Sequence, residues 1–461
     1  MSEQAADPHA TATLPPAAIS PRAPTSVNAP THKRRSRRKI GLLVAALTLP
    51  SLLAGLWIAV HSIPWMGPLV ANSLRATIGK DNVTRLEDFV YAVEDRINRA
   101  VKSGDRPRTY WKVPQKAPAR PAQPTALAPT PTPPSLATPN DSAPPAPLVF
   151  QPRDPGPAHP QWSAEGDGQW VAMLDPRRPE EPARMYKTLL HADSSRSWSE
   201  LFIVAVDLRQ VAVMPVMGYQ EPRTEKPEAA GYTRHAKIPA EHYEALLGAF
   251  NGGFMAEHGG YGVYFDGITF LDPKDEACTL VALRDGSYAV GSWTKLKERL
   301  PTMLWYRQAP ACMYEEGQMH PFLKVHQAKK WGATLDGNTV IRRSAVGLSA
   351  DGQILYVGIS NHTTAKVMAS GMHHAGAAHV AQMDVNWSYP KFVTYELDKD
   401  GQLYPVALAE GFEFSNKLYL RERSMRDFFY LARREMVQGD LDRQLAKLPA
   451  STPAPLTPSS P

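Results

Sequence analysis

The sequence contains one uncharged run long enough to cross a bilayer, and it directly follows a basic cluster. The cluster is Lys33–Lys39, and the run extends from Ile40 to Val60. A helix of about 20 apolar residues spans the roughly 30 Å of hydrocarbon in a bilayer. Because basic residues stay on the cytoplasmic side, we predict a cytoplasmic tail over 1–39 and a single-pass anchor over 40–62 in the inner (cytoplasmic) membrane. The rest of the chain is then expected in the periplasm or outside the cell. A cleaved export signal would place it on the same side.

The membrane-proximal segment 63–113 carries a helical pattern. Between residues 81 and 102 apolar residues recur at three- and four-residue spacing, which predicts an amphipathic helix. These residues are Leu86, Phe89, Val90, Val93, Ile97 and Val101. Such a helix can pack on a partner, pair with a second copy in a homo-oligomer, or lie along the bilayer surface. The sequence leaves these arrangements open.

Composition divides the remainder of the chain. The 44 prolines are unevenly placed, and residues 114–160 consist mainly of Pro, Ala and Thr. Such a segment cannot bury a core and is predicted to be an extended linker. We also predict a disordered tail over 436–461. This leaves 161–435 as the globular domain.

The pattern within 161–435 predicts an α+β fold, a strand-dominated mixed domain with a few helices. Leu201–Val206 and Val211–Met214 are apolar runs that we expect to be paired strands. Helices are expected over 239–247, 363–374 and 424–437. Asp-Gly pairs between β-rich runs predict hairpin turns, and they lie at 266–267, 285–286, 336–337, 351–352 and 400–401.

Charge and motif content argue against several function classes. Residues 1–39 hold seven Lys or Arg and two Asp or Glu, so five of the six net positive charges lie in the tail. The rest has no basic stripe, and no nucleic-acid partner is predicted. The sequence contains no Walker loop, dinucleotide fingerprint, Gly-x-Ser-x-Gly elbow or HExxH pair, so we predict no cofactor and no metal. Cys278 and Cys312 could form one disulfide or remain as two core thiols.

Three clusters within the domain combine polar side chains with predicted strand ends. The first is Gly248–Phe254, where Asn251 precedes two glycines, and His258–Gly262 continues it. Paired glycines permit a sharp turn or a close approach to a ligand. The second is Arg342–Gly347, and the third is Ala381–Ser388.

A carboxylate at a buried strand end is costly unless it is paired or faces a site. Asp384 occupies such a position, and Arg343 has the two-pronged donor group that suits a carboxylate or a phosphate. The plain alternative is a structural salt bridge between the two residues.

In this order, the three clusters resemble the phosphodiester glycosidase family, whose bacterial members are often related to exopolysaccharide. The similarity covers roughly residues 231 to 395. The matching pieces are Ala249–Phe254, Arg343–Gly347 with the Asp351-Gly352 hairpin, and the helix around 365–376 leading to the strand that ends at Asp384.

The resemblance implies cleavage of a glycosyl bond to phosphate. The transition state of such a reaction is oxocarbenium-like and is stabilised by a carboxylate, for which Asp384 is the candidate. Arg343 would hold the departing phosphate, and His258 would be the acid. The substrate-binding residues implied are Asn251, Gly252, Gly253, Tyr261, Asn386 and Trp387.

The sequence departs from the family at one point. The family's loop after the aspartate is rich in glycine, whereas Asp384 is followed here by Val385, Asn386, Trp387 and Ser388. We therefore hold two hypotheses. The first is a membrane-anchored extracytoplasmic hydrolase acting on a sugar-1-phosphodiester or a related envelope glycan. The second is a non-catalytic module on the same fold that binds glycan or serves envelope or exopolysaccharide assembly. A purely structural membrane protein that oligomerises through 81–102 is a weaker third.

Overall fold

The structure is a computed structural model that describes residues 76–113, 149–325, 339–385, 387–412 and 414–448, together with 48, 55, 70, 73, 74 and 331. The chain divides into two units, Met1–Ser73 and Leu74–Pro461. Nearly all of the predicted anchor lies outside the described residues. Within them, no helix combines the length and the apolar character needed to cross a membrane.

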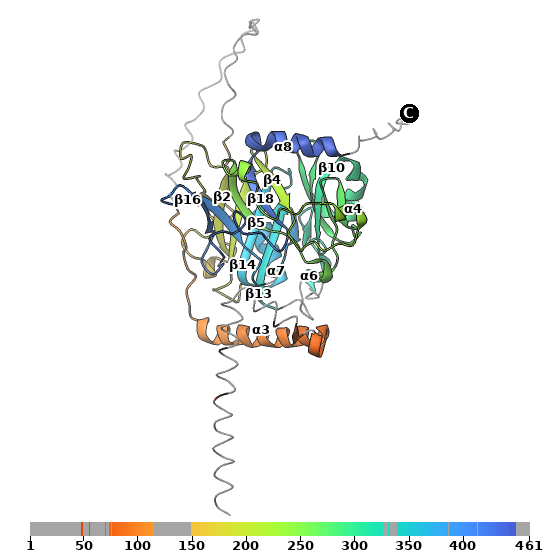
Figure 1. The fold of residues 1–461 in the computed structure, drawn as a ribbon. Helices are drawn as coiled ribbons and strands as arrows, with labels where there is room; N and C mark the ends of the chain where they lie inside the picture. Colours follow the sequence, from red (N-terminus) through yellow and green to blue (C-terminus); the bar gives the residue numbers. More distant parts are fainter. Residues whose placement is uncertain are drawn as a thin grey trace, which may run out of the picture. The chain divides into compact units, whose positions relative to one another are not determined.

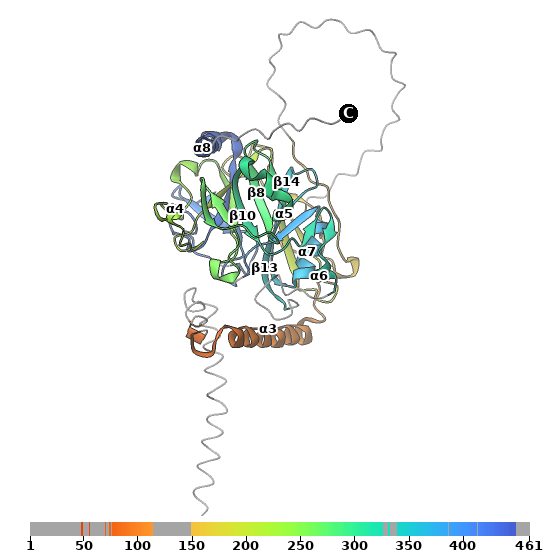
Figure 2. The same cartoon turned by 90° about the vertical axis from the view of Figure 1, so that its right-hand side faces the viewer.

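The domain is built from three sheets whose strands pair in antiparallel fashion (Figures 1 and 2). The first sheet has eight strands in the order β1 (Val171–Ala172), β2 (Met185–His191), β3 (Glu200–Asp207), β14 (Ile354–Thr363), β13 (Ile341–Leu348), β15 (His379–Gln382), β11 (Tyr314–Glu315) and β12 (Gln318–Met319). The second has the order β7 (Ile268–Leu271), β6 (Val263–Phe265), β10 (Met303–Ala309), β8 (Cys278–Leu283) and β9 (Tyr288–Ser292). The third has the order β17 (Leu403–Ala407), β16 (Phe392–Leu397), β5 (Leu246–Asn251), β18 (Phe428–Arg433) and β4 (Val211–Val216). This strand-rich mixed architecture agrees with the predicted fold class.

The first sheet is buried on both faces. Along β3, Phe202 and Val204 join the main core, which also contains Phe250 and Trp305 from the other two sheets. Their neighbour Ile203 belongs to a second core on the opposite face. Since side chains alternate along a strand, a strand covered on both sides is a continuous apolar run. This explains the unbroken sequence Leu201–Val206.

Helices cover the outside of the sheets. Helix α7 (Ala365–His374) packs on β13 and β14 through the second core (Figures 1 and 2). Its start is capped by Thr364, whose hydroxyl accepts a hydrogen bond from the Val367 amide. Helix α8 (Arg434–Lys447) lies next to β4 and β18. Helix α3 (Lys80–Lys102) matches the predicted amphipathic helix. Three single-turn helices are α4 (Pro227–Ala230), α5 (Trp293–Leu296) and α6 (Pro321–Lys324).

Four of the predicted Asp-Gly hairpins are present. They connect β6 to β7, β8 to β9, β13 to β14 and β16 to β17. In each turn the glycine has a positive φ, between 72° and 83°, which glycine adopts without the steric cost that a Cβ imposes. The fifth pair, at 336–337, lies outside the described residues.

Three local predictions are wrong. Strands β3 and β4 belong to different sheets and do not pair with each other. The predicted helix over 239–247 is a single 3-10 turn, Ala240–His242, followed by β5. The predicted helix over 424–437 is instead strand β18 followed by α8. Strand β18 lies between β5 and β4 with every residue buried, and the apolar run of a fully buried strand has the same composition as a buried helix.

The domain extends past both predicted limits. Phe150 is buried and packs edge-on against Tyr186, although 114–160 is predicted to be linker. At the other end, Val437 and Leu441 of α8 are buried in the main core, although the predicted tail begins at 436. Of the predicted linker, the structure describes only residues 149 to 160.

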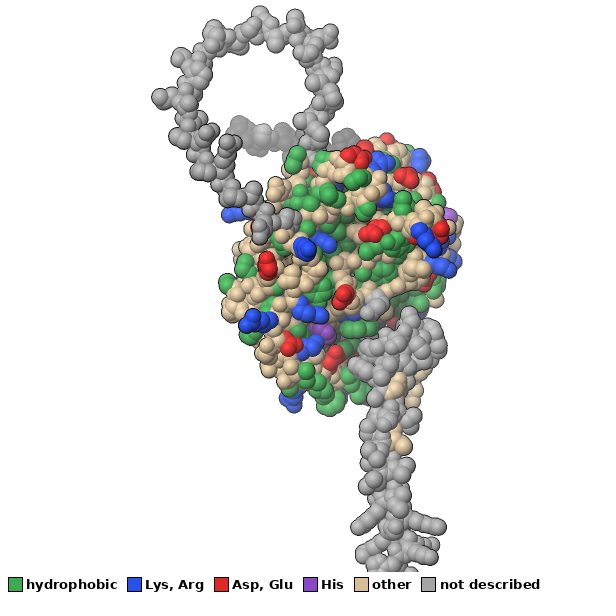
Figure 3. Space-filling model, turned by 90° about the vertical axis from the view of Figure 1, so that its left-hand side faces the viewer, with side chains coloured by type: hydrophobic (Ala, Val, Ile, Leu, Met, Phe, Trp, Pro, Cys, Tyr) green, Lys and Arg blue, Asp and Glu red, His purple; other side chains and the backbone are tan. Residues whose placement is uncertain are grey.

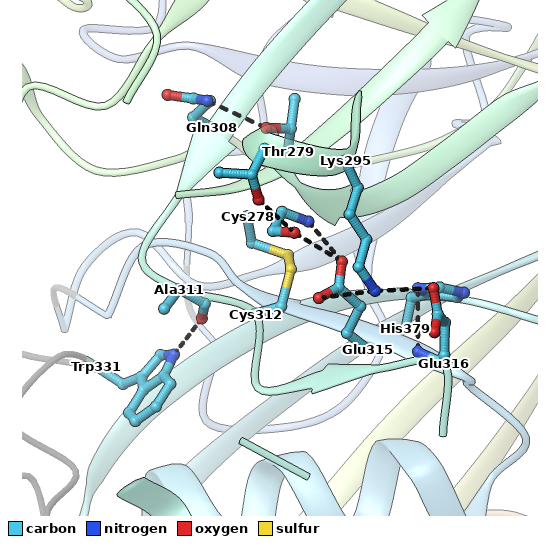
Figure 4. The surroundings of a disulfide bond; sticks show 12 residues. Cys278, Thr279, Lys295, Gln308, Ala311, Cys312, Glu315, Glu316, Trp331 and His379 are labelled. Atoms are coloured by element: carbon cyan, nitrogen blue, oxygen red, sulfur yellow. Dashed lines mark hydrogen bonds and ion pairs between the residues drawn. A yellow bond between two sulfur atoms is a disulfide. The ribbon is translucent and has the colours of Figure 1, made fainter. Parts of the chain in front are cut away.

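The two cysteines form a disulfide. Cys278 and Cys312 are bonded with a Cα–Cα distance of 4.6 Å (Figure 4), which settles the alternative left open by the sequence in favour of the bridge.

On the domain surface, the face drawn in Figure 3 carries basic and acidic side chains interspersed with one another.

Candidate functional site

Asn251 and Asp384 meet through Ser344. Asn251 is the last residue of β5 and is almost fully buried. Its side-chain amide donates a hydrogen bond to the Ser344 hydroxyl (2.9 Å), which in turn donates to the Asp384 carbonyl (2.8 Å). The Asn251 side-chain oxygen accepts a hydrogen bond from the Lys391 amide at 3.1 Å. One side chain thus ties together the end of β5, the middle of β13, the segment after β15 and the start of β16.

Gly252 and Gly253 are required by close packing. A Cβ on Gly252 would lie 2.3 Å from the Asp427 carbonyl oxygen, and one on Gly253 would lie 2.6 Å from the Arg307 guanidinium carbon. The freed space brings the backbone into contact with Asp427. Gly252 N donates to the Asp427 carbonyl (3.0 Å), and Gly253 N donates to its carboxylate (3.2 Å).

Two buried ion pairs flank this turn. Arg426 pairs with the Asp384 carboxylate and stacks over the Tyr389 ring at 3.7 Å. Arg307 pairs with Asp427 at 2.9 Å. Burial by itself would lower the pKa of Arg426, but the neighbouring Asp384 and Tyr389 raise it above its ordinary value. In either pair, removing one charge would leave its partner buried and uncompensated.

Further cations lie beside the Asp384–Arg426 pair. The Lys391 side chain is buried, and burial, helped by Arg342 and Arg426 and opposed by Glu422, lowers its pKa to about 8. Arg342 donates to the Trp387 carbonyl at 2.8 Å, and its guanidinium stacks 3.9 Å from the centre of the Trp387 ring. We call Arg342, Lys391 and Arg426 the cation cluster.

Arg343 does not join this group. It is fully buried and donates hydrogen bonds to Gln382 (2.8 Å) and to the backbone carbonyls of Thr363, Trp331 and Thr339. Burial lowers its pKa to about 9. The expected grouping of Arg343 with Asp384 is therefore not formed. The reason is strand geometry, because successive residues of β13 face opposite sides of the sheet and Ser344 is the one that contacts Asn251.

The remaining predicted site residues occupy the loops around the network. His258 ends a short 3-10 turn, with its ring 3.6 Å from the Glu257 carboxylate. Tyr261 packs edge-on against Phe254, and burial raises the pKa of its phenol. Trp387 is half-buried over Arg342. Asn386 lies outside the described residues.

The residues missed by sequence reasoning are Arg307, Lys391, Arg426 and Asp427, while Arg342 and Ser344 stood in the second cluster without an assigned role. Arg426 and Asp427 stand directly before the apolar strand β18, so the strand-end signal that singled out Asp384 was also present there. It was hidden by the expectation of a helix over 424–437. Arg307 and Lys391 gave no local signal, because only strand pairing brings them to the turn at Gly252.

A cavity of about 680 Å³ lies elsewhere, beside the disulfide. Its lining includes Cys312, Lys295, Glu315 and Glu316, and Lys295 pairs with Glu316 at 2.8 Å (Figure 4). None of the residues of the Asn251–Asp384 network lines it. Within the described part of the chain, no group of three or more His, Cys, Asp or Glu is placed to hold a metal ion.

The chain matches no protein-family model and no curated protein sequence. Among solved structures it is similar to the catalytic domain of zebrafish N-acetylglucosamine-1-phosphodiester alpha-N-acetylglucosaminidase, auto-inhibited by its pro-peptide. The TM-score is 0.35 and the identity 14%, over 57% of this chain and 88% of that one.

Two bacterial structures are also similar. A protein of unassigned function from Synechocystis has a TM-score of 0.30 and 9% identity, over 56% of this chain and 65% of that one. A protein described as exported from Burkholderia pseudomallei has a TM-score of 0.27 and 10% identity, over 55% and 75%. Similarities this low assign neither a family nor an activity, so the function has to be argued from the residues.

Proposed function

We propose that this domain is an extracytoplasmic glycosidase-like hydrolase that acts on a sugar-1-phosphodiester or a related anionic envelope glycan. The observation that carries the proposal is the buried carboxylate of Asp384 beside the cation cluster. Three cations gather around this carboxylate, while Glu422 acts on Lys391 and Glu221 acts on Arg426. A cluster of this kind is suited to an anionic ligand, since phosphate oxygens accept charge-assisted hydrogen bonds from arginine and lysine.

Hydrolysis of a sugar-1-phosphodiester can use both the Asp384 carboxylate and the cation cluster. Hydrolysis breaks the bond between the sugar carbon and the phosphate oxygen, and water supplies the hydroxyl to the sugar while its remaining proton goes to solvent. Asp384 would stabilise positive charge on the sugar carbon in the transition state. The cation cluster would stabilise the negative charge that develops on the departing phosphate.

The network is closed by the segment that follows Asp384. Trp387, Ser388 and Tyr389 are half-buried, whereas Asp384 and Arg426 beneath them are 2% and 4% exposed. A substrate would therefore approach past this segment. Trp387 replaces the glycines that are typical of the family and stacks on Arg342, which suits an aromatic platform for a sugar ring.

The same closure supports the second candidate, a non-catalytic glycan-binding or assembly module. Asp384 and Asp427 are each held by a buried arginine, and Trp387 covers Arg342. A site arranged in this way could hold an anionic glycan without admitting water for hydrolysis. The two candidates differ in whether a product forms.

The test is the release of reducing sugar from a panel of sugar-1-phosphodiesters by the purified full-length chain. Asp384→Asn is expected to reduce turnover about 100-fold or more, the loss typical of a group that stabilises transition-state charge. Asp207→Asn is the matched control, because Asp207 is equally buried and is paired with Arg209 at 2.8 Å in another part of the domain.

Turnover that survives Asp384→Asn, in a protein that unfolds at the same temperature as Asp207→Asn, would refute the catalytic proposal. Glycan binding that survives Asp384→Asn, with no product from the unsubstituted chain either, would favour the binding module.

A further inference from the structure

Helix α3 turns its acidic side toward the globular domain. Asp95 forms a two-pronged pair with Arg196 at 2.7 and 2.8 Å, and Asp88 accepts a hydrogen bond from Thr339 at 3.2 Å. Tyr91 lies near enough to Arg342 for the guanidinium to act on its pKa, although burial dominates and raises that pKa to about 12. The polar side of the helix is therefore held by the domain.

From Leu86 onward the apolar side of α3 faces outward, whereas Val83 near the start of the helix is buried. Phe89 is 66% exposed, Ile97 57% and Val101 73%, and Leu86 and Val93 are also exposed. A helix on the surface of a soluble domain normally buries this stripe against the core. Large exposed apolar patches mark contact with a membrane or another protein. We call Leu86, Phe89, Val93, Ile97 and Val101 the outward stripe.

The exposed charges on α3 are all positive. Among the α3 side chains that the structure describes, the exposed charged residues are Arg85, Arg96 and Arg99, and Arg99 pairs with Asp95 at 3.0 Å. The four described acidic residues are at least half-buried, and two of them, Glu87 and Glu94, follow the other edge of the stripe. Cations flanking an apolar stripe are the pattern of a helix that lies in the interface of an anionic bilayer.

We propose that α3 lies along an anionic lipid surface, with the outward stripe among the headgroups and upper acyl chains and with Arg85 and Arg96 on lipid phosphates. A second copy of α3 is a poorer occupant, because pairing two outward stripes would bring Arg85 and Arg96 of both copies together, whereas the described acidic residues of α3 are mostly turned toward the domain. The distance along the chain also favours lipid. The uncharged run ends at Val60, 20 residues before Lys80, and at about 3.4 Å per residue this keeps α3 within roughly 70 Å of an anchored run.

The contacts on the acidic side of α3 set how the domain is oriented on the lipid surface. Because Tyr91 and Asp88 lie against the start of β13, a docked α3 turns the Arg342 edge of the domain toward the lipid surface. The membrane contact itself is independent of any catalytic activity.

The experiment uses the full-length chain reconstituted in phosphatidylcholine vesicles with and without phosphatidylglycerol. Both native cysteines are in the disulfide, so Ile97→Cys can be labelled alone with an environment-sensitive fluorophore. Asp285→Cys, in an exposed hairpin turn, is the matched control. Aqueous iodide and nitroxide-bearing lipid are the two quenchers.

We expect iodide to quench the label at 97 at least about fivefold less than the label at 285, and nitroxide lipid to quench the label at 97 strongly when phosphatidylglycerol is present. Replacing Arg85 and Arg96 by Gln should weaken the lipid quenching without changing the unfolding temperature, since both side chains are exposed. Equal iodide quenching at the two positions would overturn the proposal. So would protection from iodide without lipid quenching, which would identify a second copy as the occupant.

Discussion

The turn at Gly252 allows a sharp test of the packing argument. In Gly252→Ala the new Cβ would lie 2.3 Å from both the carbonyl oxygen and a carboxylate oxygen of Asp427. Since a Cβ does not come this close to a non-bonded oxygen, Asp427 has to move. Its movement strains the bonds from the two glycine amides and the buried pair with Arg307. Overpacking costs about 1–3 kcal/mol, and breaking a buried ion pair costs about 3–5 kcal/mol. We therefore expect the free energy of unfolding to fall by about 2–5 kcal/mol.

The same substitution elsewhere should act in the opposite direction. Gly439 is an exposed residue inside α8, and a Cβ there meets only the end of Arg443, at 3.8 Å. Alanine has a higher helix propensity than glycine, so Gly439→Ala should stabilise the domain by up to about 1 kcal/mol. Urea titrations followed by circular dichroism measure both variants. A Gly252→Ala variant as stable as the unsubstituted chain would show that the contact between this turn and Asp427 is not as close as described.

Two further predictions concern stability. The pKa of Lys391 is lowered to about 8 in the folded state, against about 10.4 when unfolded. The unfolded chain therefore binds more protons between these values, and the free energy of unfolding should rise with pH across that window. Lys391→Met has no amine to titrate, so it should be more stable than the unsubstituted chain at pH 7, and this difference should shrink by pH 10. Parallel pH profiles of the two chains would refute the lowered pKa of Lys391. Removing the disulfide by Cys278→Ser with Cys312→Ser, at a sequence separation of 34, should cost about 3–4 kcal/mol from loop entropy, measured by urea titration under otherwise identical conditions.

The sequence by itself determined those features of the fold whose cause is local. Four of the Asp-Gly turns and the period of α3 depend on residues within a few positions of one another, and each is present as predicted. The exceptional close approach at Gly252 and Gly253 was also visible, although not the residues that demand it.

Strand pairing decided the rest. Residues 424–437 form β18 and the start of α8 because β4 and β5 bury the strand on both sides, and a local apolar run cannot specify neighbours that lie far away in the chain. For the same reason the sequence named Arg343, whereas the site side of β13 carries Ser344, and the cations beside Asp384 are Arg342, Lys391 and Arg426. Which guanidinium faces a carboxylate depends on strand register and on which face each residue occupies, and both are set only when the three sheets pack around one core.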